Sequence, residues 1–125
     1  MYSIEFIEQP VKAWDLEGLK YVRNHVSTPI VADESVFSTK DALKLIEGGY
    51  VDLLNIKLMK CGGIAEAKGI VCIIGSMMES SISVAAAAQV AAAHSNIRYF
   101  DLGAPLWLAM EPMHLKYVEE TVEIV

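Results

Sequence analysis

The sequence predicts an α/β fold that is part of a TIM-type (β/α) barrel, with about five parallel strands joined by crossover helices, one of them shortened. Five apolar runs of the 125-residue chain each end on a charged residue, and these residues recur every 22 to 25 positions. A strand-like run followed by a helix-like segment at a nearly constant interval is typical of consecutive βα units. The charged residues that end the runs are Glu8, Asp33, Lys57, Glu79 and Asp101.

The position of these charges predicts a functional site. Parallel strands joined by right-handed crossovers place all their C-terminal ends at one edge of the sheet. In a (β/α) barrel, active sites lie at that edge. We therefore expect the five charged side chains to gather there.

The first two βα units have clear boundaries. Gln9-Pro10 ends the first strand, and Asp15 is a suitable N-cap for a helix that continues to Val26. Thr28-Pro29 ends this helix and begins the second strand, because the residue before a proline disfavours helix. Apolar residues share one face of the helix at helical spacing: Leu16, Leu19, Val22 and Val26.

The next helix is expected to begin after Ser38, which resembles the N-cap of a capping box with Asp41. It runs to Glu47, where Gly48-Gly49 supplies a helix stop. The third strand should then extend over residues 51–58.

The connection after the third strand is unusually short. Only the segment Cys61 to Gly69 separates Lys60 from Ile70, whereas a parallel crossover normally needs about a dozen residues or more. We expect room for about one helical turn there.

The chain then continues with a fourth strand, an alanine-rich helix at 82–94 and a fifth strand at 99–102. We assign residues 1–108 to a partial barrel domain and residues 109–125 to an acidic C-terminal tail.

Composition narrows the class of protein. A net charge of −6 disfavours nucleic acid or an anionic membrane as a partner. The longest apolar stretch is too short to span a membrane, and no signal peptide is expected. Cys61 and Cys72 lack the spacing of a metal site, so a cytoplasmic protein with reduced thiols is predicted. Open sheet edges would favour a homo-oligomer or a further portion that completes the sheet.

Strand alternation selects residues on the third strand. Asn55 and Lys57 share one face, and Leu54 and Ile56 share the other. The apolar face suits a layer of helices, so Asn55 and Lys57 should point into the barrel. A lysine there is costly unless it is paired or functional. Two interpretations remain open: a proton donor or acceptor, and a structural lysine paired to a carboxylate.

Glu8 and Asp33 end neighbouring strands, which suggests a site for a hard divalent cation. The alternative is that each carboxylate caps the loop after its strand. Glu34 points to the opposite face from Asp33, so we expect it to support the site without binding the ion.

Glu79 and Asp101 are weaker candidates, each being either a loop cap or a substrate contact. Lys60 lies just past the third strand, where we expect a solvated side chain.

At this point the residues resemble a known family. Four segments, in order, are similar to motifs of the enolase superfamily, in its muconate-lactonizing branch, and most of all to the dipeptide (L-Ala-D/L-Glu) epimerases. These segments are Ile7-Glu8-Gln9-Pro10, Ala32-Asp33-Glu34-Ser35, Asn55-Ile56-Lys57-Leu58-Met59-Lys60-Cys61-Gly62-Gly63 and Gly75-Ser76-Met77-Met78-Glu79-Ser80.

The resemblance implies a fold and a chemistry. The family has a capping domain and a (β/α)7β barrel, binds Mg²⁺ through three carboxylates and removes the proton α to a substrate carboxylate. By resemblance, Glu8 and Asp33 are metal ligands and Lys57 is the acid/base residue. Asp101 would hold the ammonium group of a dipeptide. The expected substrate-binding residues are Asn55, Glu79 and Asp101.

Three departures from the family pattern stand out. The chain begins near the family's fourth barrel strand, so the Lys-x-Lys base and the third carboxylate ligand fall outside it. The helix between the sixth and seventh strands is largely missing. Gly103 occupies the position of the second Asp in the family's Asp-x-Asp motif.

The resulting functional prediction is the C-terminal portion of a Mg²⁺-dependent isomerase, similar to dipeptide epimerases and acting on a small carboxylate such as a dipeptide. The alternative enzyme is similar to muconate cycloisomerase or o-succinylbenzoate synthase. A third reading, of another class, is a non-catalytic truncated remnant. The isolated chain is expected to be inactive, because epimerisation needs an acid/base group on each face of the α-carbon and Lys57 supplies one.

Overall fold

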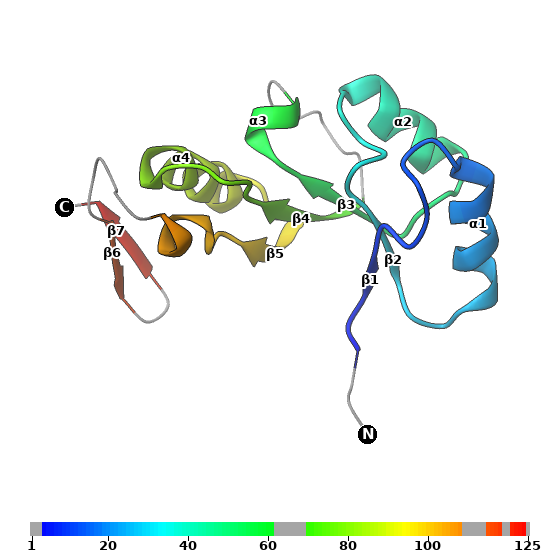
Figure 1. The fold of residues 1–125 in the computed structure, drawn as a ribbon, viewed down its shortest axis with the longest axis horizontal. Helices are drawn as coiled ribbons and strands as arrows, with labels where there is room; N and C mark the ends of the chain where they lie inside the picture. The colour runs from blue at the N-terminus through cyan, green and yellow to red at the C-terminus, as the bar shows by residue number, and fades with distance from the viewer. Residues whose placement is uncertain (1–3, 62–69, 109–114, 119–120, 125) are drawn as a thin grey trace.

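A computed structural model describes residues 4–61, 70–108, 115–118 and 121–124 (Figure 1). One parallel sheet contains five strands in chain order: β1 (Ile7–Glu8), β2 (Ile30–Ala32), β3 (Leu53–Ile56), β4 (Val71–Gly75) and β5 (Ile97–Asp101). The three longer helices alternate with these strands: α1 (Leu16–His25), α2 (Thr39–Glu47) and α4 (Ser81–Ala93). The predicted parallel order and βα alternation are therefore confirmed.

The helix-covered face of the sheet forms the main core. Leu54 and Ile56 of β3 are buried in it together with Cys72 and Ile74 of β4. The same cluster contains apolar residues of the helices: Leu19, Ala42, Leu45, Ala87 and Ala91. The alternation expected for the third strand is thus correct, because its apolar face packs against helices.

The opposite face, which we call the inner face, has a smaller apolar layer. Val31, Leu53 and Ile73 are buried side by side on neighbouring strands, with Phe6 and Tyr99 packed against them. The rings of Phe6 and Tyr99 meet edge to face with centroids 5.4 Å apart. This layer closes the inner face below the C-terminal edge of the sheet.

The helix ends follow the sequence signals. Asp15 Oδ1 accepts a hydrogen bond from Gly18 N at 2.9 Å, and Ser38 Oγ accepts one from Asp41 N at 3.2 Å. Gly49, with φ at +62°, follows the end of α2 in the left-handed region that favours glycine. Both predicted N-caps and the glycine stop are confirmed.

Strand β3 is shorter than expected. It ends at Ile56, and Leu58 begins the short helix α3 (Leu58–Cys61), so the predicted strand to residue 58 is wrong. The backbone turns because Lys60 N donates to Lys57 O at 2.9 Å. Strand β5 begins two residues before its predicted start. Most of the short crossover lies outside the described residues, yet β3 and β4 pair in parallel.

The last described elements are the 3-10 helix η1 (Ala104–Trp107) and an antiparallel hairpin of β6 (Leu115–Val118) and β7 (Thr121–Ile124). The hairpin lies within the segment predicted to be an acidic tail, and the domain boundary after residue 108 stays a prediction. Within the described ranges, no helix is both long and apolar enough to cross a membrane.

Candidate functional site

Polar residues lie directly above the inner apolar layer, at the C-terminal edge of the sheet. On each strand the polar residue is two positions beyond an apolar one, so both point to the same face. Thus Glu8 follows Phe6 on β1, and Asp33 follows Val31 just after β2. The corresponding positions on the next three strands are Asn55, Gly75 and Asp101. The strand ends therefore meet at one edge, as predicted.

Asp33 binds two lysines. Its Oδ2 lies 2.6 Å from Lys57 Nζ and its Oδ1 lies 2.6 Å from Lys60 Nζ. The side chains of Asp33, Lys57 and Lys60 are only 6%, 14% and 9% exposed. Each carboxylate oxygen therefore pairs with a different ammonium group in a largely buried cluster, where a charge needs a partner.

The ion pairs decide the protonation states. Burial would raise the pKa of Asp33, but hydrogen bonds and charges from Lys57 and Lys60 outweigh it and lower that pKa. Burial would lower the pKa of Lys57, but Asp33, with smaller contributions from Glu8 and Glu34, raises it. Asp33 is therefore a carboxylate and Lys57 an ammonium in this arrangement.

Glu8 is held by Asn55. The Nδ2 atom of Asn55 donates to Glu8 Oε1 at 2.6 Å, and Asn55 is 2% exposed. The Oδ1 atom of Asn55 is buried, and it has no hydrogen-bond partner among the described residues. A buried carbonyl oxygen without a donor is costly, so the site has one oxygen available for a cation or a donor group.

Gln9 connects the ends of β1 and β2. Its Oε1 accepts from Asp33 N at 3.0 Å and from Ser35 N at 3.2 Å. Its Nε2 donates to Val11 O at 3.1 Å and to Ser35 Oγ at 2.8 Å. The backbone on which Asp33 sits is thereby tied to the residue that follows Glu8.

The β4–β5 side of the edge is different. Gly75 leaves space, since a Cβ there would lie 2.5 Å from Asn55 Oδ1. Glu79 is buried, and its carboxylate accepts from Met77 N at 2.7 Å and from the Ser83 hydroxyl. Asp101 is exposed. Of the predicted substrate contacts, Glu79 thus holds its own loop at the start of α4, and the Asp101 side chain stays accessible.

The sequence-based reading of Lys60 as a solvated residue is wrong. The turn of α3 places Lys60 three residues beyond Lys57, where both side chains lie on one face and reach the same carboxylate. The spacing Lys57-x-x-Lys60 could have indicated that the two lysines lie together. It does so only for helical backbone, and the sequence alone did not show that the strand ends before Lys57. Glu34 is exposed and acts on Lys57 through its charge.

The oxygen atoms of the site suit a hard divalent cation. Carboxylate and amide oxygens are the ligands that Mg²⁺ prefers, and the site offers Glu8, Asp33 and the unpartnered Asn55 Oδ1. In the part of the chain that the structure describes, no group of three or more His, Cys, Asp or Glu residues is placed to hold a metal. The described residues therefore offer two carboxylates and one amide oxygen for such an ion, and both oxygens of Asp33 are paired with lysines in this arrangement.

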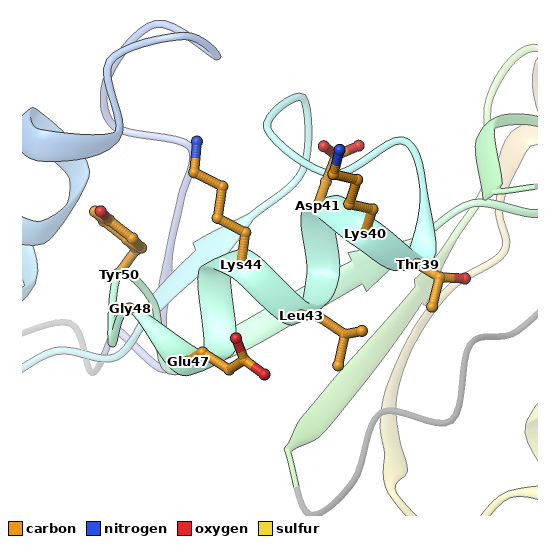
Figure 2. Close-up of a pocket in the computed structure, with 8 residues that line it drawn as sticks. All are labelled: Thr39, Lys40, Asp41, Leu43, Lys44, Glu47, Gly48 and Tyr50. Carbon is orange, nitrogen blue, oxygen red and sulfur yellow. The ribbon is translucent and has the colours of Figure 1, made fainter.

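A separate hollow lies on the outer side of α2 (Figure 2). Its lining comes from α2 and the residues directly after it: Thr39, Lys40, Asp41, Leu43, Lys44, Glu47, Gly48 and Tyr50. None of the residues predicted for the functional site is among these, so the hollow is distinct from the edge site.

Comparisons with known proteins agree with the geometry. The Enolase C-terminal domain-like family matches residues 1–124. The chain is 52% identical over 122 residues to the hydrophobic dipeptide epimerase of Enterococcus faecalis, a match that covers 90% of this chain and 34% of that protein.

Two solved structures are similar. A substrate-liganded complex of the L-Ala-D/L-Glu epimerase from Bacillus subtilis has a TM-score of 0.89 and 41% identity, covering 98% of this chain and 37% of that one. A dipeptide epimerase from Enterococcus faecalis, complexed with Mg and the dipeptide L-Leu-L-Tyr, has a TM-score of 0.84 and 52% identity, covering 90% and 35%. The chain spans about a third of the length of these relatives. It belongs to the enolase C-terminal domain-like family and corresponds to the C-terminal barrel portion of these isomerases.

Proposed function

We propose that this chain supplies part of the active site of a Mg²⁺-dependent isomerase of the dipeptide-epimerase type. The reaction would remove a proton from the carbon next to a substrate carboxylate and then return a proton to the same carbon. The observation that supports this most is the buried cluster in which Lys57 and Asp33 meet beside Glu8 and Asn55 at the C-terminal edge. A positioned acid/base group beside metal-binding carboxylates is what this chemistry needs.

Glu8 and Asp33 are proposed to hold the Mg²⁺. Their neighbouring strands and the free Asn55 Oδ1 support this assignment, as does the relative solved with Mg and a dipeptide. When bound, the ion would act as a Lewis acid on the substrate carboxylate. Glu34 would support the site through its charge alone.

Lys57 is proposed as the acid/base residue. Its ammonium group is held at a fixed point by Asp33, with the Lys60 ammonium on the other carboxylate oxygen. As an ammonium, Lys57 can deliver a proton, and it can accept one only after it has lost its own and become a neutral amine. One lysine serves one face of the α-carbon, so the isolated chain is expected not to epimerise a substrate.

Substrate contacts are proposed on the β4–β5 side. Asp101 has an exposed carboxylate suited to an ammonium group, and Asn55 and Glu79 would form the wall beside it. A Cβ built on Gly103 meets nothing within 4 Å. Space for a second acidic side chain is therefore present although this chain lacks one, so a substrate with a less tightly held ammonium group is expected.

A non-catalytic role is the second candidate. Both oxygens of Asp33 pair with lysines, and Glu8 accepts a hydrogen bond from Asn55. Such a cluster can be a structural remnant of a former site. Metal binding and proton exchange separate the two proposals.

The test uses a chimera. Residues 1–124 would replace the matching segment of the L-Ala-D/L-Glu epimerase from Bacillus subtilis, and α-proton exchange of L-Ala-L-Glu in D₂O would be followed by NMR. We expect deuteration and epimerisation that are lost with Lys57→Ala and strongly reduced with Glu8→Gln. A folded chimera that exchanges no proton would contradict the enzymatic proposal and favour the remnant.

We also propose a cytoplasmic location and self-association. Cys72 is a buried free thiol, and burial raises its pKa to about 11, which keeps it protonated and unreactive. Strands β1 and β5 end the sheet, and exposed apolar side chains lie beside and on them at Ile4 and Phe100. Such edges favour pairing with another segment or a second copy.

A further inference from the structure

Gln9 uses both polar atoms of its side-chain amide to join two loops. The carbonyl oxygen accepts from Asp33 N and Ser35 N, and the amide nitrogen donates to Val11 O and Ser35 Oγ. Ser35 Oγ in turn donates to Ala13 O at 2.8 Å. The loop after β1 and the loop after β2 therefore share one hydrogen-bond network centred on Gln9.

The backbone of Gln9 is in an unusual conformation. Its φ is +39°, and it is the only non-glycine residue with positive φ in the described ranges. It also precedes Pro10, a position that favours extended backbone. Residues persist in sparsely populated regions only when the surrounding structure holds them there. The four hydrogen bonds of the side chain, together with the hydrogen bond from Gln9 N to Val31 O at 2.9 Å, hold Gln9 in this conformation.

The location of Gln9 connects this network to the proposed ion. Gln9 directly follows Glu8, and its Oε1 holds the backbone N–H of Asp33. This side chain thus ties the backbone that follows Glu8 to the backbone of Asp33, in addition to the strand hydrogen bond from Gln9 N to Val31 O at 2.9 Å.

We propose that Gln9 is a positioning residue that sets the separation of the Glu8 and Asp33 carboxylates and so preorganises the divalent-cation site. This inference rests on the proposed function. Ligand groups held by hydrogen-bonded supports bind a metal more tightly than the same groups left free. The side chain must be an amide, because its nitrogen donates two hydrogen bonds and its oxygen accepts two.

The alternative is that Gln9 only stabilises the loops. The two roles differ in what they change: a loop support lowers the stability of the fold, whereas a positioning residue also lowers metal affinity among the molecules that remain folded. A metal-binding measurement on the folded fraction separates them.

The experiment measures Mn²⁺ binding by electron paramagnetic resonance, with Mn²⁺ as the stand-in for Mg²⁺. Gln9→Met removes all four hydrogen bonds at similar size and without adding charge. Gln9→Asn keeps the amide and tolerates positive φ, but is one methylene too short. Ser38→Ala, which removes the cap of α2 outside this network, is the control for lost stability.

We expect Gln9→Met to weaken Mn²⁺ binding at least tenfold and Gln9→Asn to weaken it less, while Ser38→Ala stays within twofold of the wild type. If Gln9→Met does not fold, the Mn²⁺ affinity of Gln9→Asn, compared with wild type and Ser38→Ala, tests the positioning role instead. Wild-type affinity in the folded Gln9 variants would overturn the positioning role.

A reference variant without the two proposed ligands distinguishes a wrong positioning role for Gln9 from a wrong metal site. Glu8→Gln combined with Asp33→Asn should abolish Mn²⁺ binding. If it does so while the Gln9 variants bind normally, only the positioning role is wrong. If wild type and this double variant bind Mn²⁺ equally, or neither binds it, the proposed metal site is wrong and the inference falls with it.

Discussion

The two halves of the C-terminal edge use the same repeating strand positions in opposite ways. At the ends of β1 to β3, Asp33 and Lys57 form an ion pair in a largely buried cluster, and the buried Asn55 donates a hydrogen bond to the exposed Glu8. At the ends of β4 and β5, Gly75 has no side chain and Asp101 is exposed. One half therefore concentrates charge, and the other provides space and access.

The difference has a direct physical cause. Gly75 lies against Asn55 and Lys57, and a Cβ there would be 2.5 Å from Asn55 Oδ1 and 3.0 Å from Lys57 Cε. The charged half can reach its present geometry only because the neighbouring strand leaves room. The arrangement of Asn55 and Lys57 at the end of β3 thus depends on the absence of a side chain at Gly75 of β4.

The largest effect is expected for Asp33→Asn. This change leaves Lys57 and Lys60 buried near each other without the carboxylate that pairs with both, so the free energy of unfolding should fall by about 3–5 kcal/mol. The matched variant in the open half, Asp101→Asn, should change it by less than about 0.5 kcal/mol. Urea denaturation measures both. Equal losses in the two variants would show that the halves do not differ as described.

At acidic pH, the difference in the free energy of unfolding between wild type and Asp33→Asn should become smaller. The pKa of Asp33 is lowered in the folded protein, so its ionised form stabilises the fold above the usual carboxyl range, and this stabilisation is lost as pH falls through the folded pKa. The gap in stability between wild type and Asp33→Asn should therefore be full at pH 7 and shrink below about pH 4. Urea titrations at several pH values would test this. A gap that is constant with pH would mean that Asp33 does not act through its charge.

The dependence of one half on the other can be tested with Gly75→Ala. The added methyl group should displace Asn55 and Lys57 and lower the free energy of unfolding by about 1–3 kcal/mol. Gly103→Ala is the control, because its Cβ meets no atom within 4 Å and its φ is −79°. That variant should be neutral or slightly more stable. Similar losses at both positions would argue against a special role for Gly75.

A smaller effect is expected for Glu79→Gln. The carboxylate accepts hydrogen bonds from Met77 N and the Ser83 hydroxyl, and an amide can replace only part of this, so the loss should be roughly 1–2 kcal/mol. Ser80, the N-cap residue of α4, makes no capping hydrogen bond with its side chain, so Ser80→Ala should change stability less than Glu79→Gln. Thermal denaturation would rank the two variants, and the reverse order would refute this assignment for Glu79.

Much of the architecture was accessible from the sequence alone. Strand order, the shared edge, both N-caps and the inward direction of Asn55 and Lys57 all follow from local spacing, because strand alternation and βα repetition are properties of nearby residues. The residues proposed for the metal, Glu8 and Asp33, were selected in the same way. Their roles stay predictions, yet their place at one edge is confirmed.

The pairings at this edge were decided only by the tertiary structure. Lys60 reaches Asp33 because the chain turns into α3 right after β3. Gln9 reaches the backbone of Asp33, and Glu79 turns to its own loop. The contacts of Lys60 and Gln9 with Asp33 join residues on different strands or loops, and they depend on distances of a few ångströms that residue spacing does not specify. The sequence by itself determined which edge contains the site, and three-dimensional packing determined which charges there neutralise one another.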